Sequence, residues 1–192
     1  MSMDLPKLNL IAENDNLRPA FECILLTRKH MVATNGQVLC GSMTKNHFSK
    51  DFIEQIPKEG VLIHRADWGR IFTSRDAQWE GRFIKFYFDK KRPVIVEPIA
   101  INKFQPTFPK WEAIIPDNGE IKAHSRDGVL GINGNLLSRI QKCFKAGGVE
   151  LYFQENPNYG IIVKPMMTPI ENGFALIMPV MIGGDISFNV EL

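Results

Sequence analysis

The chain has 192 residues, of which 44% are hydrophobic, with 23 basic and 21 acidic side chains. This composition is typical of a globular protein with one or two small domains. The formal net charge of +2 is too small to indicate nucleic-acid binding by itself, because non-specific affinity for DNA comes from clustered cations rather than from their total.

The cysteines and the hydropathy pattern indicate the cellular compartment in which we expect the protein. Cys23, Cys40 and Cys143 have no paired spacing, so we expect buried thiols in a reducing compartment rather than a disulfide framework, with Cys23 and Cys40 on neighbouring strands. No stretch approaches the ~20 apolar residues of a membrane span, and the N-terminus lacks the pattern of a signal peptide. We therefore expect a cytoplasmic protein.

The N-terminal part of the chain contains three segments that we expect to be strands. They read PKLNLIA (6–12), AFECILLTRK (20–29) and HMVATNGQVLCGSM (30–43). Each runs or alternates apolar, and the third contains the turn signal Asn35-Gly36.

An internal repeat follows these segments. Residues 60–72 match 128–144, residues 82–98 match 147–165, and FPKWEAIIP (108–116) matches FALIMPVMI (174–182), with a spacing of 66 to 68 residues. A constant spacing over three consecutive elements indicates duplicated supersecondary units.

Each copy of the repeat predicts the same order of elements. A short strand, Val61 to His64 or Val129 to Ile132, leads into a helix, Ala66 to Ser74 or a second one capped by Asn133 or Asn135. Two apolar runs with a polar turn between them predict a hairpin, and a third run closes the unit. The predicted fold is α+β, built from strand-helix-strand-strand-strand modules with antiparallel sheets and two helices on one side.

Four stretches of the sequence resemble the bacterial DNA sliding clamp, the β subunit of DNA polymerase III. They are LRPAFECILL followed by HMVATNGQVL, then FPKWEAIIP, then INGNLLSRIQKCF with VELYFQ and GIIVKP, and finally ALIMPVMI. The resemblance implies a DNA-clamp-like fold in a shortened or divergent member. It implies a clamp-like domain at 1–116, similar to the middle clamp domain, and a half domain at 117–192, similar to the end of the C-terminal domain.

The resemblance also implies a peptide-binding groove, because partner proteins of the clamp dock a short peptide between its middle and C-terminal domains. Carried over by position, the groove residues are Thr34, Gly36, Gln37, Leu39, Pro109, Ile114, Leu176, Met178 and Pro179. Flexible methionines suit varied ligands. The alternative to a groove role for Ile114, Leu176 and Met178 is that these side chains pack in an ordinary sheet core.

In the family the helices line a channel around duplex DNA. Arg139, Lys142 and Lys145 recur every three residues on the second predicted helix, so all three are expected to face one way. Arg70 and Arg75 take this role on the first helix. Such a face would contact phosphates without reading sequence, and the alternative is a solvated helix surface.

The sequence contains no local catalytic or metal-binding motif, so we expect no enzyme, no metal and no cofactor. The leading hypothesis is a non-catalytic clamp-like protein of DNA replication or repair that binds partner peptides and duplex DNA. A homo-oligomer is one expected form of this protein. The alternative is a stand-alone interaction protein of mobile-element or phage type. It would mimic or occupy a replication-protein surface without binding DNA.

Overall fold

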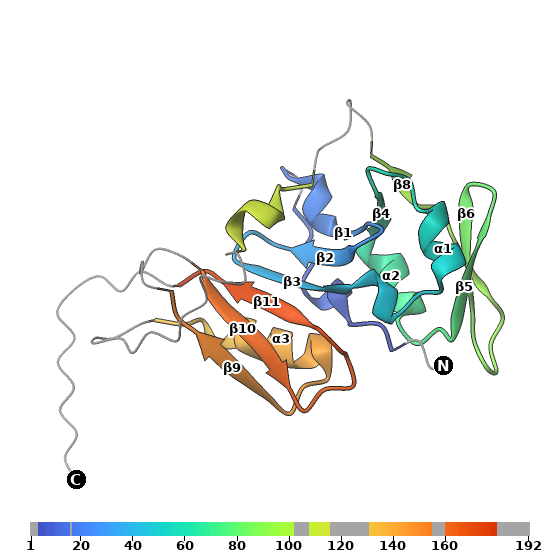
Figure 1. The fold of residues 1–192 in the computed structure, drawn as a ribbon. Coiled ribbons are helices and arrows are strands. Elements are labelled where there is room, and N and C mark those ends of the chain that lie inside the picture. The colour runs from blue at the N-terminus through green and yellow to red at the C-terminus, as the bar shows by residue number, and fades with distance from the viewer. Residues whose placement is uncertain (1–3, 16, 102–107, 116–130, 155–159, 180–192) are drawn as a thin grey trace, which may run out of the picture.

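An eight-stranded antiparallel sheet organises the chain (Figure 1). The computed structural model describes residues 4–15, 17–101, 108–115, 131–154 and 160–179. In the order in which they lie side by side, the strands are β8 (Ile99–Ala100), β4 (Val61–His64), β1 (Cys23–Leu26), β2 (His30–Thr34), β3 (Val38–Met43), β11 (Phe174–Ile177), β10 (Ile161–Met166) and β9 (Gly148–Tyr152). The C-terminal strands thus extend the sheet that the N-terminal strands begin.

A second, three-stranded sheet lies at the end of the molecule opposite β9 (Figure 1). Its strands, all paired antiparallel, are β5 (Asp76–Glu80), β6 (Phe83–Tyr87) and β7 (Val94–Val96). Ile84 and Phe86 of β6 alternate with more exposed neighbours and point into the main core. This sheet therefore packs onto the same core as the larger one.

Three α-helices and four short 3-10 turns complete the described structure. They are α1 (Lys50–Gln55), α2 (Arg65–Ile71), α3 (Gly134–Phe144), η1 (Leu8–Leu10), η2 (Pro19–Glu22), η3 (Thr44–Asn46) and η4 (Trp111–Ile114). The side chain of Asn133 accepts a hydrogen bond from the Asn135 amide and so caps α3. The helix ends where Lys145 adopts a left-handed conformation, with φ at 52°. None of the described helices has the length and apolar character that crossing a bilayer requires.

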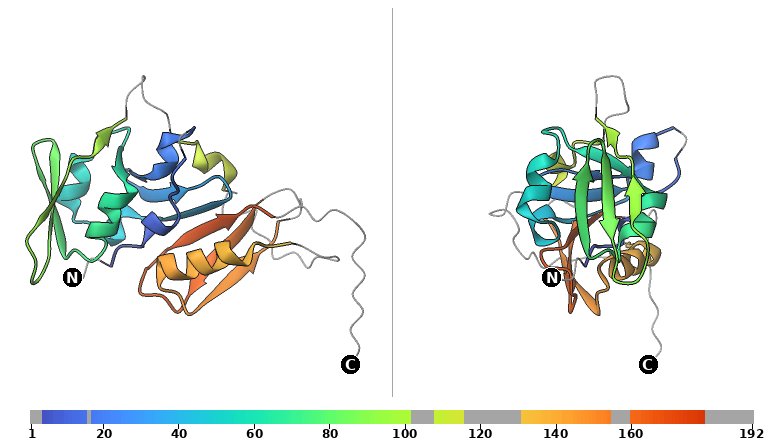
Figure 2. Two further views of the ribbon diagram at one scale, coloured as in Figure 1. Left: turned by 180° about the vertical axis from the view of Figure 1, so that it is seen from behind. Right: turned by 90° about the vertical axis from the view of Figure 1, so that its right-hand side faces the viewer.

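The two faces of the large sheet have different coverings. Ile24 and Leu26 of β1 point into the main core, where α2, α3 and η1 pack, and Figure 2 shows α3 lying along one face of β9 to β11. Cys23 and Leu25 point to the opposite face, where Trp111 of η4 covers them. The helices and η4 therefore lie on opposite sides of the sheet.

Most of the predicted architecture is confirmed. The fold is α+β with antiparallel sheets, helices α2 and α3 pack on one side, and hairpins form from β6 with β7 and from β9 with β10. The strands β1 to β3 lie within the segments predicted for them. Helix α2 ends at Ile71 rather than Ser74, and neither α1 nor β5 was predicted.

Two predicted strands are wrong. PKLNLIA contains the 3-10 turn η1, because Leu8, Ile11 and Ala12 have helical spacing and all three are fully buried. FPKWEAIIP contains η4 instead of a closing strand, so the repeat does not extend to its third element. Pro109 provides no backbone donor for a sheet ladder, and burial of Trp111 requires only a short turn.

The cysteines are free and buried as predicted, but their placement differs from the expectation. Cys23 lies on β1 and Cys40 on β3, with β2 between them. Burial raises the pKa of the Cys40 thiol, and its hydrogen bond with Cys143 acts in the same direction. Residues 116–130, where the predicted boundary between the two domains falls, and the chain beyond Pro179 lie outside the described residues. The division into domains at residue 116 stays a prediction.

Candidate functional site

A pocket of about 210 Å³ lies between η4, β3 and β11. Eight of the nine residues predicted for a peptide groove line it, namely Thr34, Gly36, Gln37, Leu39, Pro109, Ile114, Leu176 and Met178. Pro179 follows Met178 directly but is not part of the lining. The lining also includes Phe21, Val38, Lys110 and Trp111, which sequence reasoning missed. Segments that are far apart in the sequence thus meet at one place.

Pairing of β3 with β11 builds the floor of this pocket. Leu39 lies opposite Leu176 in the register, and the Met178 amide continues the ladder by donating to the Gln37 carbonyl at 2.9 Å. Leu39 is 2% exposed and Leu176 is 3% exposed. The floor is therefore part of the sheet core as well as part of the pocket.

A rigid turn between β2 and β3 forms one rim. The Thr34 hydroxyl donates to the Val38 carbonyl at 2.9 Å, and the Asn35 carboxamide oxygen accepts from the amides of Gln37 and Val38, both at 3.0 Å. Gly36 adopts a φ of +88°, a conformation that glycine takes without strain. These hydrogen bonds satisfy the turn internally and hold its backbone at the edge of the pocket.

The opposite rim comes from η4. Trp111 is 4% exposed and stacks on Phe174 of β11 with ring centroids 5.8 Å apart, while the His30 ring meets it edge-on at 5.2 Å. These aromatic contacts attach η4 to the sheet. Ile114 and Met178 are 52% and 40% exposed, and both lie at the same pocket. Core packing thus accounts for Leu39 and Leu176, but not for Ile114 and Met178.

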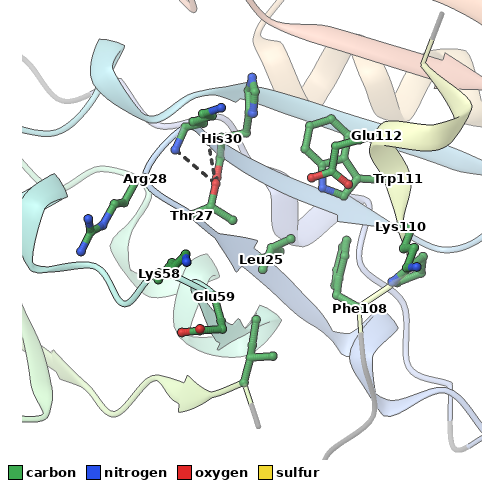
Figure 3. Close-up of a pocket in the computed structure, with 13 residues that line it drawn as sticks. Leu25, Thr27, Arg28, His30, Lys58, Glu59, Phe108, Lys110, Trp111 and Glu112 are labelled. Atoms are coloured by element: carbon green, nitrogen blue, oxygen red, sulfur yellow. Dashed lines mark hydrogen bonds between the residues drawn. The ribbon is translucent and has the colours of Figure 1, made fainter. Parts of the chain in front are cut away.

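A second, larger pocket of about 660 Å³ adjoins the first (Figure 3). Leu25, Ile101 and Phe108 supply apolar lining, and Pro109, Lys110 and Trp111 belong to both pockets. Burial lowers the pKa of His30 on its wall, with Glu112 acting in the opposite direction. Nothing in the sequence pattern indicated this pocket.

Four of the five cations predicted for DNA contact form ion pairs. Arg70 pairs with Asp67 at 3.1 Å, Arg75 with Asp89 at 2.9 Å, and Lys145 with Asp4 at 3.1 Å. The fifth cation, Lys142, is exposed and forms no ion pair within the described residues.

Arg139 differs most from its expected role. Its guanidinium donates to the Leu10 carbonyl at 2.8 Å and to the Glu13 carboxylate at 2.5 Å. Burial acts to raise the pKa of Glu13, but hydrogen bonds from Arg139 and Asn35 outweigh it and the pKa is lowered. The α3 cations therefore do not form one open face, because Arg139 turns back toward η1.

The described residues contain no cluster of three or more histidine, cysteine, aspartate or glutamate side chains that could hold a metal ion. The apolar pocket between η4, β3 and β11, with Ile114 and Met178 open at its rim, is the site whose geometry points to binding.

Comparison with known proteins identifies the fold. No protein-family model and no curated protein matches the sequence. Among solved structures, the chain is similar to DNA polymerase III subunit β from Borrelia burgdorferi, solved with a natural product, at a TM-score of 0.63 and 13% identity over 92% of this chain and 60% of that one. It is also similar to the sliding clamp of Bartonella birtlesii bound to griselimycin (TM-score 0.58, 12% identity, 92% and 63% covered) and to subunit β of Thermotoga maritima (0.56, 12%, 92% and 63%).

Sequence identities of 12% to 13% show a shared fold and nothing further. The chain spans 60% to 63% of the length of these three clamps. Over that span, the arrangement of antiparallel sheets and helices resembles theirs, as the four sequence stretches predicted. The chain therefore has the fold of the bacterial DNA sliding clamp, the β subunit of DNA polymerase III.

Proposed function

We propose that this chain is a non-catalytic, clamp-like scaffold of DNA replication or repair. In this proposal the pocket between η4, β3 and β11 binds an apolar segment of a partner protein. The observation that carries the proposal is the exposure of Ile114 and Met178 above the buried floor of Leu39 and Leu176. Large apolar side chains that stay open to solvent around a concave site are typical of a binding surface.

The chemistry of the lining supports a peptide as the ligand. The exposed Gln37 provides a polar side chain on one rim, whereas Ile114 and Met178 provide apolar contacts on the others. A peptide with apolar anchors would bury these side chains and orient its backbone against the polar rim. Methionine adapts its shape to different anchors, so Met178 suits a surface that receives several partners.

Binding of duplex DNA through α2 and α3 has less support. It rests mainly on Lys142, because Arg70, Arg75, Arg139 and Lys145 each have a carboxylate partner. Paired cations contribute less to phosphate neutralisation than free ones, so any DNA contact of this chain would be weak and sensitive to salt.

Fluorescence anisotropy with a labelled clamp-binding peptide from a bacterial replication protein tests the proposal. We expect saturable binding that the unlabelled peptide reverses, and loss of binding in Met178→Asp. Griselimycin, which the Bartonella birtlesii clamp binds, serves as a second competitor. Sedimentation velocity on the same sample reports the oligomeric state. A folded protein that binds neither probe would overturn the proposal.

A further inference from the structure

We propose that the second pocket, on the other side of Trp111, receives an acidic segment that flanks the apolar anchors of the same partner peptide. This inference rests on the proposed peptide binding and adds the chemistry of the flank. In it, Trp111 separates an apolar subsite from a cationic one.

The two pockets are neighbours on either side of η4. Pro109, Lys110 and Trp111 line both of them, so a peptide anchored in the apolar pocket has to pass only this short segment to reach the second one. At about 660 Å³ against 210 Å³, the second pocket has room for several further side chains. A short anchor segment would fill only the first.

The charge of the second pocket selects an acidic ligand. Its lining contains the four cations Arg28, Lys29, Lys58 and Lys110, against the two carboxylates Glu59 and Glu112. Within the described part of the chain, none of the four cations forms an ion pair. The Arg28 guanidinium donates to two backbone carbonyls, those of Ile56 at 2.7 Å and Glu54 at 3.1 Å, so no carboxylate neutralises it. Positive charge remains for a ligand to neutralise.

The floor of the second pocket is apolar. Leu25 and Phe108 lie there below the indole of Trp111, with charged residues toward the edges (Figure 3). Glutamate side chains fit this arrangement, since their methylene groups can pack on the floor while their carboxylates reach the lysines. The pocket lies on the sheet face that η4 covers, away from α2 and α3, which argues for a peptide rather than duplex DNA as the source of the negative charge.

Peptides that differ only in their flank test this inference. The labelled clamp-binding peptide is extended at either end with three glutamates, three glutamines or three lysines. At low salt we expect the glutamate flank at one end to bind about 5-fold more tightly than the glutamine flank, and the lysine flank to bind more weakly. The difference between flanks should shrink as salt increases.

Variants locate the contact. Lys29 and Lys58 line only the second pocket, so the double variant Lys29→Gln/Lys58→Gln should remove the advantage of the glutamate flank and leave the affinity for the glutamine flank unchanged. The double variant Lys90→Gln/Lys91→Gln, at two exposed lysines between β6 and β7, removes the same net charge and is the control. The inference is overturned, with peptide binding intact, if glutamate and glutamine flanks bind equally or if Lys90→Gln/Lys91→Gln has the same effect. Failure of every peptide to bind would overturn the proposed function as well.

Discussion

Leu39 on β3 and Leu176 on β11 lie directly opposite each other in the large sheet, and together they form the floor of the apolar pocket. The pocket therefore exists only when a strand from the beginning of the chain pairs with one from the end. Formation of the pocket thus requires pairing of β11 with β3.

Leu39→Asp should unfold the protein rather than abolish binding selectively. The side chain is 2% exposed, and an aspartate there would place a carboxylate in the apolar cluster around Leu176 and Trp111. We expect a loss of more than about 3 kcal/mol, measured by urea denaturation. A variant with wild-type stability would mean that Leu39 is less buried than the structure has it.

Met178→Asp and Ile114→Asp should abolish peptide binding with a change in stability of less than about 0.5 kcal/mol. Both side chains are substantially exposed, so a carboxylate stays hydrated in the free protein, but it would be desolvated by a bound peptide. Met167→Asp is the matched control, because Met167 is 77% exposed and does not line the pocket. Peptide affinity measured by anisotropy should fall in the first two variants only. Equal affinity in all three would remove the apolar pocket as the binding site.

The resemblance to the sliding clamp predicted most of the residues that line the pocket, and two local signals agree with it. The Asn35-Gly36 turn fixes one rim, and the Met178-containing run is apolar although it ends a strand. The resemblance placed these segments together, and eight of the nine residues carried over from it line the pocket. Phe21 and Trp111 were missed because they reach the pocket through 3-10 turns, whose positions depend on tertiary packing.

The side chain of Arg139 departs from the predicted basic face for a different physical reason. A spacing of three residues correctly places the backbone positions of Arg139 and Lys142 near one another on α3. It does not determine the direction of a long side chain, and the Arg139 guanidinium finds a carbonyl and a carboxylate on the N-terminal segment. Such partners are visible only in three dimensions.

Trp111→Phe should cost less stability than Trp68→Phe. The buried Nε1 of Trp111 has no hydrogen-bond acceptor among the described residues, whereas the Nε1 of Trp68 donates to the Pro6 carbonyl at 2.8 Å. Removing an unsatisfied donor offsets part of the lost apolar contact, but removing a bonded donor leaves a buried carbonyl unpaired. We expect a change within about 1 kcal/mol for Trp111→Phe and a loss of about 2 kcal/mol or more for Trp68→Phe.

Chemical denaturation of the two variants at one pH measures these changes. Trp111→Ala should cost about 3–5 kcal/mol, since it removes the ring that stacks on Phe174 and covers the sheet. Equal losses in the two phenylalanine variants would contradict the assignment of an unsatisfied donor at Trp111.

Stability should fall in mild acid because of His47. Burial lowers the pKa of His47 from 6.5 to about 4, with Asp4 acting in the opposite direction, and its Nε2 lies 2.9 Å from the Ser42 hydroxyl. Below pH 6.5 the unfolded chain takes up a proton that the folded chain refuses. The stability that neutral His47 contributes is therefore complete above pH 6.5 and is lost as the pH falls to about 4, by about 3 kcal/mol.

His47→Gln isolates this effect because glutamine keeps a hydrogen-bonding group near Ser42 but does not titrate. Urea denaturation at several pH values should show wild type losing more stability than the variant between pH 7 and pH 4. Other titrating groups, including His30, cancel in the difference. Parallel curves for the two proteins would contradict the lowered pKa.

Lys142→Glu tests DNA contact on α3 without a large change in stability, whereas Arg139→Glu would also destabilise the fold. Arg139→Glu would place a second carboxylate beside Glu13 and leave the Leu10 carbonyl without its donor, so we expect a loss of about 1–3 kcal/mol. Lys142 is exposed, and its replacement should change stability by less than about 0.5 kcal/mol.

Anisotropy measures the salt dependence of duplex DNA binding by wild type and by Lys142→Glu. The difference between the two slopes reports the contribution of Lys142. If Lys142 contacts a phosphate, Lys142→Glu should reduce the slope of log affinity against log salt by about 0.9. Lys90→Glu, which changes the net charge equally on the β6–β7 turn, should leave the slope close to that of wild type. An equal reduction in both variants would mean that total charge rather than α3 holds the DNA. An unchanged slope in Lys142→Glu would mean that Lys142 contacts no phosphate.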